Sequence, residues 1–424
     1  MIKFRKRKLR FKVPDRSGVM FGLFLAMVLF IPFTKISVPA IHLYELTLGD
    51  CILIVLSFLT VYFNLGMRKS FMPFYILLIL FTFVSFCSIV MVRDWLNFLL
   101  SLMPFGFSLL ISYVTLSYFS TGNLKNRMRV IRNLLVFSLF LSAIPVYMQF
   151  IAGFKNILFY DPFGWRYTFL SQNPNQFGVY FILFFFMITL ITVKFFPKTL
   201  GKVVLFEAFF FIPALFSGSR STTLVFTLNF LLLLGFYFVN TSHAKRFSIA
   251  SIAFVFVSVI FQPAMNYIKT QAGQLRRALS IFEKVQDGAD FEIGGAIQHS
   301  IEDAMILYYQ YPILGVGLGN KPAYSGVKTE VHNTFILYLS ETGTLGFILF
   351  MLMFLITPLY AIFSRANFKF IMLVLVIFVL FAAQNVPAML FRQRWVWLFL
   401  CISFVLVNVD KEGNYQTSKI QLFN

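Results

Sequence analysis

The sequence predicts an all-α integral membrane protein with about 12 membrane-spanning helices. Hydrophobic residues make up 59% of the 424-residue chain, charged residues only 12%, and the mean hydropathy is +0.81. A soluble domain carries roughly 25% charged residues. Apolar runs long enough to cross a bilayer recur along nearly the whole chain. The loops between them alternate between basic and poorly basic, which is the pattern of a chain that crosses the membrane repeatedly.

The expected spans follow these apolar runs in order. The strongly basic segment before Gly18 is expected in the cytoplasm. The runs then predict spans at residues 18–33, 48–65, 71–92, 95–119, 133–152, 177–196, a run ending at 217, 222–239, 247–261, 332–363, 370–383 and 395–409. Gly343 and Gly346 predict a break after a short first segment of the tenth span. On this count both termini lie in the cytoplasm.

The chain is expected to form a single membrane domain over residues 1–424, with one long extracytoplasmic loop at residues 262–331 between the ninth and tenth spans. Two stretches of this loop, residues 265–285 and 296–311, predict amphipathic helices. On the second helix, one face is approximately formed by Ile297, Ile301, Met305, Tyr308 and Tyr311. Such a helix would either lie flat on the membrane or act as a packing lid.

Composition and motifs exclude several classes of function. The net charge of +20 is placed in short loops between apolar runs, so basic residues orient helices and face lipid, and no nucleic-acid partner is expected. Cys51, Cys87 and Cys401 lie inside apolar runs, which predicts neither disulfides nor a metal site. The 59 phenylalanines are expected to be lipid-facing bulk. No nucleotide-binding or metal-ligating motif is present, so no cofactor and no metal is expected.

Arginines outside the cytoplasm need a separate explanation, because the topology pattern accounts only for the inner ones. On this topology Arg93 lies in an outer loop that Asp94 makes nearly charge-neutral, and the outer arginines left unexplained are Arg166, Arg220, Arg276, Arg277, Arg392 and Arg394. Arg220 lies between two apolar runs, and the guanidinium fork suits phosphate, so an anionic lipid-linked ligand is the functional interpretation. The alternative is that Arg220 reaches to lipid headgroups. Arg392 and Arg394 are expected mainly as interfacial anchors.

His332 is the second candidate, at the point where the long loop meets the tenth span. A neutral imidazole can accept a proton from a hydroxyl near neutral pH, as a general base must. A lone histidine is usually structural, but Asn333 follows at once and Glu341 lies nine residues on. Asn333 and Glu341 are therefore expected to bind substrate. Glu207, within an apolar run, is either a buried polar contact or part of a proton path.

Three segments together resemble a known family. In chain order they are W-R-Y-T-F-L-S-Q-N-P-N-Q-F-G, then F-S-G-S-R-S, then P-I-L-G-V-G-L-G-N followed by V-H-N-T-F-I-L-Y-L-S-E-T-G-T-L-G. In order along residues 166–346 they resemble the O-antigen polymerase and O-antigen ligase superfamily, with its glycosyltransferase-C-like membrane fold. The resemblance implies that Arg220 binds a pyrophosphate, His332 assists an acceptor hydroxyl and Arg166 contacts a phosphate. The family often has an arginine near Gln298 and His299, so Arg276 or Arg277 would take its place.

The resemblance implies a bacterial enzyme of the cytoplasmic (inner) membrane with its active site on the outer face. It would be a metal-independent, inverting glycosyltransferase that polymerises the repeat units of an O-antigen, exopolysaccharide or capsule, taking glycan from an undecaprenyl-pyrophosphate-linked donor to a hydroxyl of a second lipid-linked unit. The expected partners are these lipid-linked sugars, membrane lipid and other assembly proteins such as a flippase and a chain-length regulator. A ligase that transfers glycan to lipid A core or protein is the close alternative. A flippase or transporter is the alternative of another class, although it should carry inverted repeats.

Overall fold

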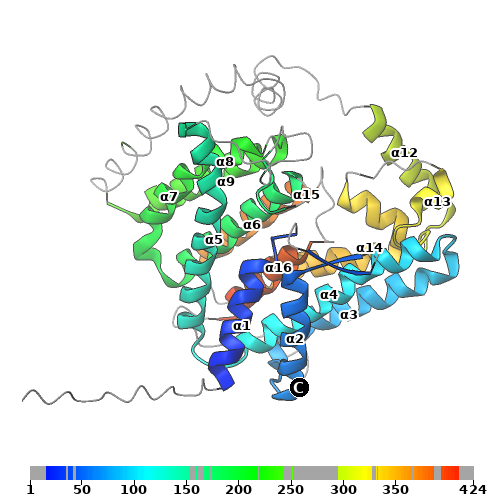
Figure 1. Ribbon diagram of the computed structural model, residues 1–424, viewed down its shortest axis with the longest axis horizontal. Coiled ribbons are helices and arrows are strands. Elements are labelled where there is room, and N and C mark those ends of the chain that lie inside the picture. The colour runs from blue at the N-terminus through cyan, green and yellow to red at the C-terminus, as the bar shows by residue number, and fades with distance from the viewer. Residues whose placement is uncertain are drawn as a thin grey trace, which may run out of the picture.

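The computed structural model describes residues 16–34, 37–41, 44–152, 159, 167–171, 174–217, 219–242, 251, 295–326, 331, 333–364, 367–385 and 393–409. These residues are overwhelmingly helical (Figure 1), which confirms the all-α class. Within the described part, the one sheet is a short antiparallel hairpin of β1 (Ser37–Ile41) and β2 (Tyr44–Thr47). The expected span at 247–261, apart from residue 251, and the expected amphipathic helix at 265–285 lie outside the described residues.

The expected spans in the described part coincide with helices. In chain order the first helices are α1 (Arg16–Phe30), α2 (Leu48–Tyr62), α3 (Met72–Cys87), α4 (Trp95–Phe119), α5 (Leu124–Ala152), α6 (Pro174–Phe195), α7 (Leu200–Phe209), α8 (Phe211–Phe216) and α9 (Arg220–Asn240). After the long loop come α12 (Gly295–Gln310), α13 (Lys321–Ser325), α14 (Thr334–Phe363), α15 (Phe368–Asn385) and α16 (Arg394–Val407). The seventh expected run is divided into α7 and α8 at Phe210.

Seven helices of the described part are long and apolar enough to cross a membrane. Three shorter apolar helices, α1, α2 and α16, accompany them. The protein is therefore a multi-pass membrane protein. The amphipathic helix expected at residues 296–311 corresponds to α12, so the part of the long loop near the tenth span is helical as expected.

The centre of the bundle is formed by α6 and α16, which pack against each other (Figure 1). Every residue of α16 is buried. On α6, Phe185 and Phe186 are fully buried, and the ring centroid of Phe186 lies 6.0 Å from that of Phe399 on α16. The expectation that phenylalanine is lipid-facing bulk was wrong for these residues. The physical reason is that a helix surrounded by other helices is as apolar as one surrounded by lipid.

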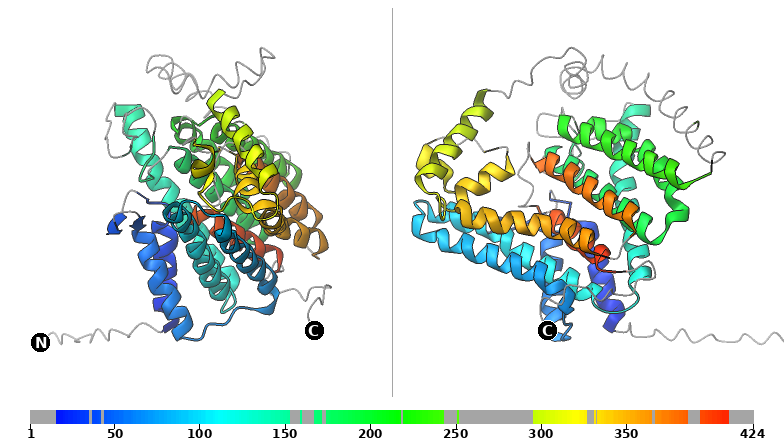
Figure 2. Two further views of the ribbon diagram at one scale, coloured as in Figure 1. Left: turned by 90° about the vertical axis from the view of Figure 1, so that its right-hand side faces the viewer. Right: turned by 180° about the vertical axis from the view of Figure 1, so that it is seen from behind.

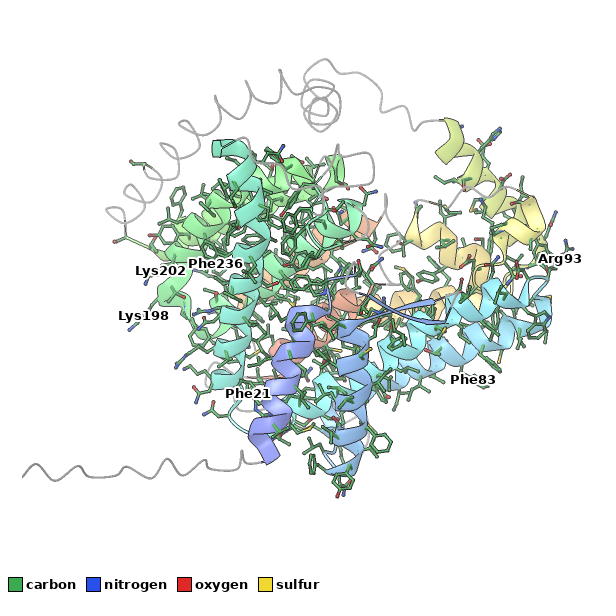
Figure 3. All side chains as sticks on the ribbon, in the orientation of Figure 1. Phe21, Phe83, Arg93, Lys198, Lys202 and Phe236 are labelled. Atoms are coloured by element: carbon green, nitrogen blue, oxygen red, sulfur yellow. The ribbon has the colours of Figure 1, made fainter. Side chains whose placement is uncertain are left out.

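Contacts between helix ends agree with the expected sidedness. Arg68 Nε donates to the Ser120 carbonyl at 3.0 Å, and Lys369 Nζ donates to Asn240 Oδ1 at 2.9 Å. Each bond joins two segments that the charge alternation assigns to the cytoplasm. Figure 3 shows Lys198 and Lys202, also assigned inside, at the opposite end of the molecule from Arg93, which is assigned outside.

Candidate functional site

A sharp break divides α14 into residues 334–342 and 344–363. Gly343 has φ 63° and ψ −169°, a conformation open essentially to glycine alone. The break was predicted from the glycines. It leaves backbone groups on both sides of Gly343 without helical partners, and these must be satisfied elsewhere because they are buried.

The glycine-rich turn after α12 supplies those partners. The carbonyls of Pro312 and Ile313 accept from Thr344 N and Leu345 N at 2.8 and 3.3 Å. In the other direction, Val316 N and Gly317 N donate to the carbonyls of Ser340 and Glu341 at 3.1 and 2.9 Å. These hydrogen bonds join the turn to residues on both sides of the break at Gly343. The G-x-G-x-G segment and the S-E-T-G-T-L-G segment form one folded unit.

Glycine is required in this turn for close approach as well as for conformation. Gly315 has φ +68°, and a Cβ there would lie 2.5 Å from the Glu341 carbonyl carbon. Gly315, Gly317 and Gly319 all have positive φ, which glycine adopts readily, and they form this tight turn. Asn320, at the end of the turn, fixes it to the α3–α4 connection, because its Oδ1 accepts from Arg93 N at 3.1 Å and from Asp94 N at 2.7 Å.

The first segment of α14 folds back along the second (Figure 2). The rings of Phe335 and Phe354 lie 6.2 Å apart, and those of Tyr338 and Phe350 lie 4.8 Å apart. In a straight helix a separation of 19 residues would place Phe335 and Phe354 about 28 Å apart. The break therefore returns the start of α14, and with it the residue that follows His332, toward the middle of the second segment.

Asn333 is the N-cap of α14. Its Oδ1 accepts from Phe335 N at 3.0 Å and from Ile336 N at 3.1 Å, which satisfies two of the free amides of the helix end. Val331, on the other side of His332, is buried and packs with Ala304 of α12 and Leu337 of α14. The chain is thus held firmly on both sides of His332.

Arg220 is the first residue of α9, and its neighbours contact the segment that follows Arg166. Tyr167 N donates to the Phe216 carbonyl at 3.1 Å. A Cβ on Gly178 of α6 would lie 2.1 Å from Thr222 Oγ1, so α6 and α9 approach closely at their N-terminal ends. The W-R-Y-T-F-L-S-Q-N-P-N-Q-F-G and F-S-G-S-R-S segments therefore lie against each other.

A chain of contacts through α15 connects the two regions. The ring of Phe354, which Phe335 meets, stacks on Phe381 of α15 with centroids 5.5 Å apart. About one turn further along α15, Gln384 Nε2 donates to Ser221 Oγ at 3.3 Å. The residue after Arg220 is thus linked, through α15, to the folded-back start of α14.

The site residues expected from the sequence are covered unevenly by the described part of the chain. Arg166, Arg276, Arg277 and His332 lie outside the described residues, and for Arg220 the description covers the backbone only. Asn333 and Glu341 are described, and Glu341 is buried with 2% of its surface exposed. Among the described residues no group of three or more His, Cys, Asp and Glu is arranged to hold a metal ion.

Lys321 is a buried cation that sequence reasoning missed. Only 2% of its surface is exposed, and its Nζ donates to Ser300 Oγ of α12 at 2.7 Å. Burial lowers the pKa of Lys321, while the nearby carboxylates of Asp303 and Glu341 raise it. The lysine thus places positive charge between α12, α13 and α14. A single lysine in a polar loop carries no sequence signal that separates it from a solvated one.

A buried charge pair joins α2 to α16. Arg394 Nε lies 2.8 Å from Asp50 Oδ1, and Arg394 Nη2 donates to Asp50 Oδ2 at 2.9 Å. Asp50 Oδ2 also accepts from Thr47 N at 3.0 Å. The expectation that Arg394 is an interfacial anchor was wrong, because only 9% of its surface is exposed and its charge is neutralised inside the protein.

Glu207 is a buried polar contact. Its Oε1 accepts a hydrogen bond from Asn229 Nδ2, which joins α7 to α9, and both residues are buried. This contact agrees with the interpretation of Glu207 as a buried polar contact, the first of the two that the sequence left open.

Comparison with known proteins is consistent with these observations. Residues 205–351 match the family model described as O-antigen ligase, a range that begins in α7 and ends in α14. No curated protein matches the chain. The matched range contains Arg220, His332, the glycine-rich turn and the break at Gly343. This match over residues 205–351 supports the O-antigen polymerase and O-antigen ligase superfamily that the sequence segments resemble.

Proposed function

We propose that this protein is a bacterial polysaccharide repeat-unit polymerase that works at the outer face of the cytoplasmic membrane. It would transfer a glycan from an undecaprenyl-pyrophosphate-linked donor to a hydroxyl of a second lipid-linked unit. The family domain supports glycan transfer of the O-antigen polymerase and ligase type. The identities of donor and acceptor, and the choice of polymerisation over ligation, are proposals.

The observation that carries the proposal is the gathering of three separate sequence segments. Tyr167 is bonded to the segment before Arg220, Ser221 is bonded to α15, and α15 stacks on the ring that meets Phe335. Residues within four positions of Arg166, Arg220 and His332 are therefore joined by a short chain of contacts. This supports a common site for the three side chains.

Arg220 is proposed to hold the pyrophosphate of the donor. Its position as first residue of α9 favours an anion twice over, because a helix N-terminus carries about half a positive charge in addition to the guanidinium. Arg166 would contact a phosphate from the neighbouring segment, and Arg276 or Arg277 would add charge from the long loop. Positive groups fixed in advance stabilise the negative charge that develops on the departing pyrophosphate.

His332 is proposed to act on the acceptor. The acceptor oxygen attacks the anomeric carbon from the side opposite the pyrophosphate, a new C–O glycosidic bond forms, and the bond to the pyrophosphate oxygen breaks. The hydroxyl proton passes to the His332 imidazole and then to water. Undecaprenyl pyrophosphate leaves, and the anomeric configuration is inverted. Glu341 and Asn333 would orient the histidine and the acceptor.

The test is a reaction of purified protein with one lipid-linked repeat unit and no other acceptor. Chains that lengthen indicate a polymerase, whereas product only after addition of a distinct glycan or protein acceptor would indicate a ligase. Movement of the unit across vesicles without a new glycosidic bond would indicate a transporter. Either of the last two outcomes overturns the proposal.

Two variants with matched controls test the residues. Arg220→Ala and His332→Ala are expected to reduce turnover by about 100-fold or more, the range for loss of one charge-stabilising or proton-transferring group. Arg129→Ala, on an inner segment, and His299→Ala, whose side chain is 84% exposed, should keep near-normal turnover. Equal activity of Arg220→Ala and Arg129→Ala in correctly folded protein would contradict the role of Arg220.

A further inference from the structure

The second segment of α14 carries a stripe of exposed apolar side chains. Its members are spaced alternately by three and four residues, so they share one face of the helix; they are Leu345, Ile348, Leu352, Leu355, Leu359 and Ile362, with exposures from 38% to 50%. From residue 345 to residue 362 the helix rises about 25 Å, close to the roughly 30 Å of a bilayer's hydrocarbon core. This lipid-facing stripe is therefore the surface that α14 presents to the membrane.

The exposed apolar surface does not end at Leu345. Leu345 N donates to the Ile313 carbonyl at 3.3 Å, so the two residues adjoin, and Ile313 is 64% exposed. On α12, Tyr309 is 73% and Ile306 is 54% exposed. Ile306 and Tyr309 are three residues apart on α12 and so share one face of the helix, and Ile313 lies in the turn that follows; we call these three residues the outward face. The surface thus continues from the lipid-facing stripe onto the extracytoplasmic loop.

The opposite side of α12 is the side that packs on the protein. Ser300, Ala304 and Leu307 are buried, and Ala304 packs with Val331 and Leu337. The sequence interpretation placed the apolar face of this helix elsewhere, at Ile301 and Tyr308, both of which are half-buried. The helix is consequently apolar on two sides. A helix that faces water on its outer side is normally polar there.

The distance that this apolar surface would span across a bilayer is consistent with lipid as its partner. Residues 306–310 of α12 rise about 6 Å and the three turn residues 311–313 reach at most about 10 Å, so together with the lipid-facing stripe they span at most about 41 Å, within the 40–45 Å of a bilayer including its headgroups. Neighbouring Trp95, at the start of α4, is 55% exposed, and tryptophan and tyrosine concentrate at the membrane–water interface. Tyr311, which follows α12, contacts Tyr324, whose ring lies under Arg93, two residues before Trp95. Toward its N-terminal end α12 presents polar side chains to the outside, among them Glu302 and His299, which are both exposed.

We propose that α12 is an interfacial helix and that the outward face, Ile306 and Tyr309 of α12 with Ile313 of the following turn, inserts into the headgroup region of the outer leaflet. Lipid on one side and α14 on the other would then hold the loop that carries the glycine-rich turn and the residues flanking His332. The occupant of this face is bilayer lipid. The proposal does not depend on which glycan-transfer reaction the protein performs.

The test places a fluorescent label on α12 in full-length protein reconstituted in vesicles of phosphatidylethanolamine and phosphatidylglycerol. In a background with Cys51, Cys87 and Cys401 changed to alanine, Ile306→Cys and Tyr309→Cys report on the outward face. Glu302→Cys is the matched control at the polar end of the same helix, and Leu352→Cys is the control for lipid contact. Labels at 306, 309 and 352 should be quenched several-fold more by a lipid-borne quencher than by an aqueous one, and the label at 302 should show the reverse.

Two outcomes would overturn the proposal. If the aqueous quencher acts equally at 306 and 302, the outward face is in water. If neither quencher reaches 306 and 309 while both controls respond, a protein surface covers the face, and a second copy or another assembly protein is the occupant. Activity is not part of this readout, so the result stands apart from the test of glycan transfer.

Discussion

Substitution of Gly343 by alanine tests whether the break in α14 organises the site. Alanine at φ 63° and ψ −169° is strained by about 1–3 kcal/mol. Its Cβ would also lie 2.3 Å from the Ile313 carbonyl oxygen, so the turn must move away. That movement weakens the bonds of Thr344 N and Leu345 N to the turn, each worth about 0.5–1.5 kcal/mol. The expected loss is about 2–6 kcal/mol.

Gly235→Ala is the matched control, because Gly235 lies within α9 and a Cβ there has nothing within 4 Å. This change should be neutral or should stabilise the protein by roughly 0.5–1 kcal/mol. Thermal unfolding of the purified variants compares the two, and amide hydrogen exchange locates the effect. Gly343→Ala should unfold at a lower temperature and exchange faster at Val316, Gly317 and Thr344. Equal unfolding temperatures for the two variants, with unchanged exchange at these amides, would refute the reasoning.

Two further predictions concern the buried charges. Burial lowers the pKa of Lys321, so in the alkaline range below the ordinary lysine pKa the unfolded chain binds more protons than the folded one. The free energy of unfolding should therefore rise with pH in this range. Lys321→Met should remove this part of the rise in unfolding temperature with pH, and an unchanged rise would contradict the reasoning. Asp50→Asn leaves Arg394 buried without its counter-charge and should cost about 3–5 kcal/mol, whereas the double variant Asp50→Asn with Arg394→Met should recover much of the loss; a double variant no more stable than Asp50→Asn would argue against the pair.

Helix positions were predictable from the sequence because hydrocarbon thickness and loop charge constrain them strongly. The fourth expected span, residues 95–119, has the same bounds as α4 (Trp95–Phe119). The break at Gly343 was also predictable, since glycine permits backbone conformations closed to other residues. The return of Phe335 onto Phe354 was not, because a glycine marks where a helix can turn and does not encode the direction.

The buried charges show where sequence reasoning ends. Asp50 and Arg394 are 344 residues apart, and nothing local to either residue indicates that they meet. Phe185 and Phe399 are buried, yet they are chemically the same as phenylalanines on the lipid surface. For the site itself, Arg220 and His332 were singled out by their places in the chain and the resemblance implied their roles, but the contacts of their neighbours became visible only in three dimensions.

Complete enclosure of α16 has a consequence for how the protein responds to membranes of different thickness. At 14 residues the helix is about 21 Å long, too short to match a hydrocarbon core of roughly 30 Å. Because other helices surround it, thickening or thinning of the bilayer exerts no direct force on it. The adjustment must fall on the outer helices α3 and α14, whose exposed faces meet the lipid. Acyl-chain length would then act on the proposed site through the break at Gly343, while the central helices keep their packing.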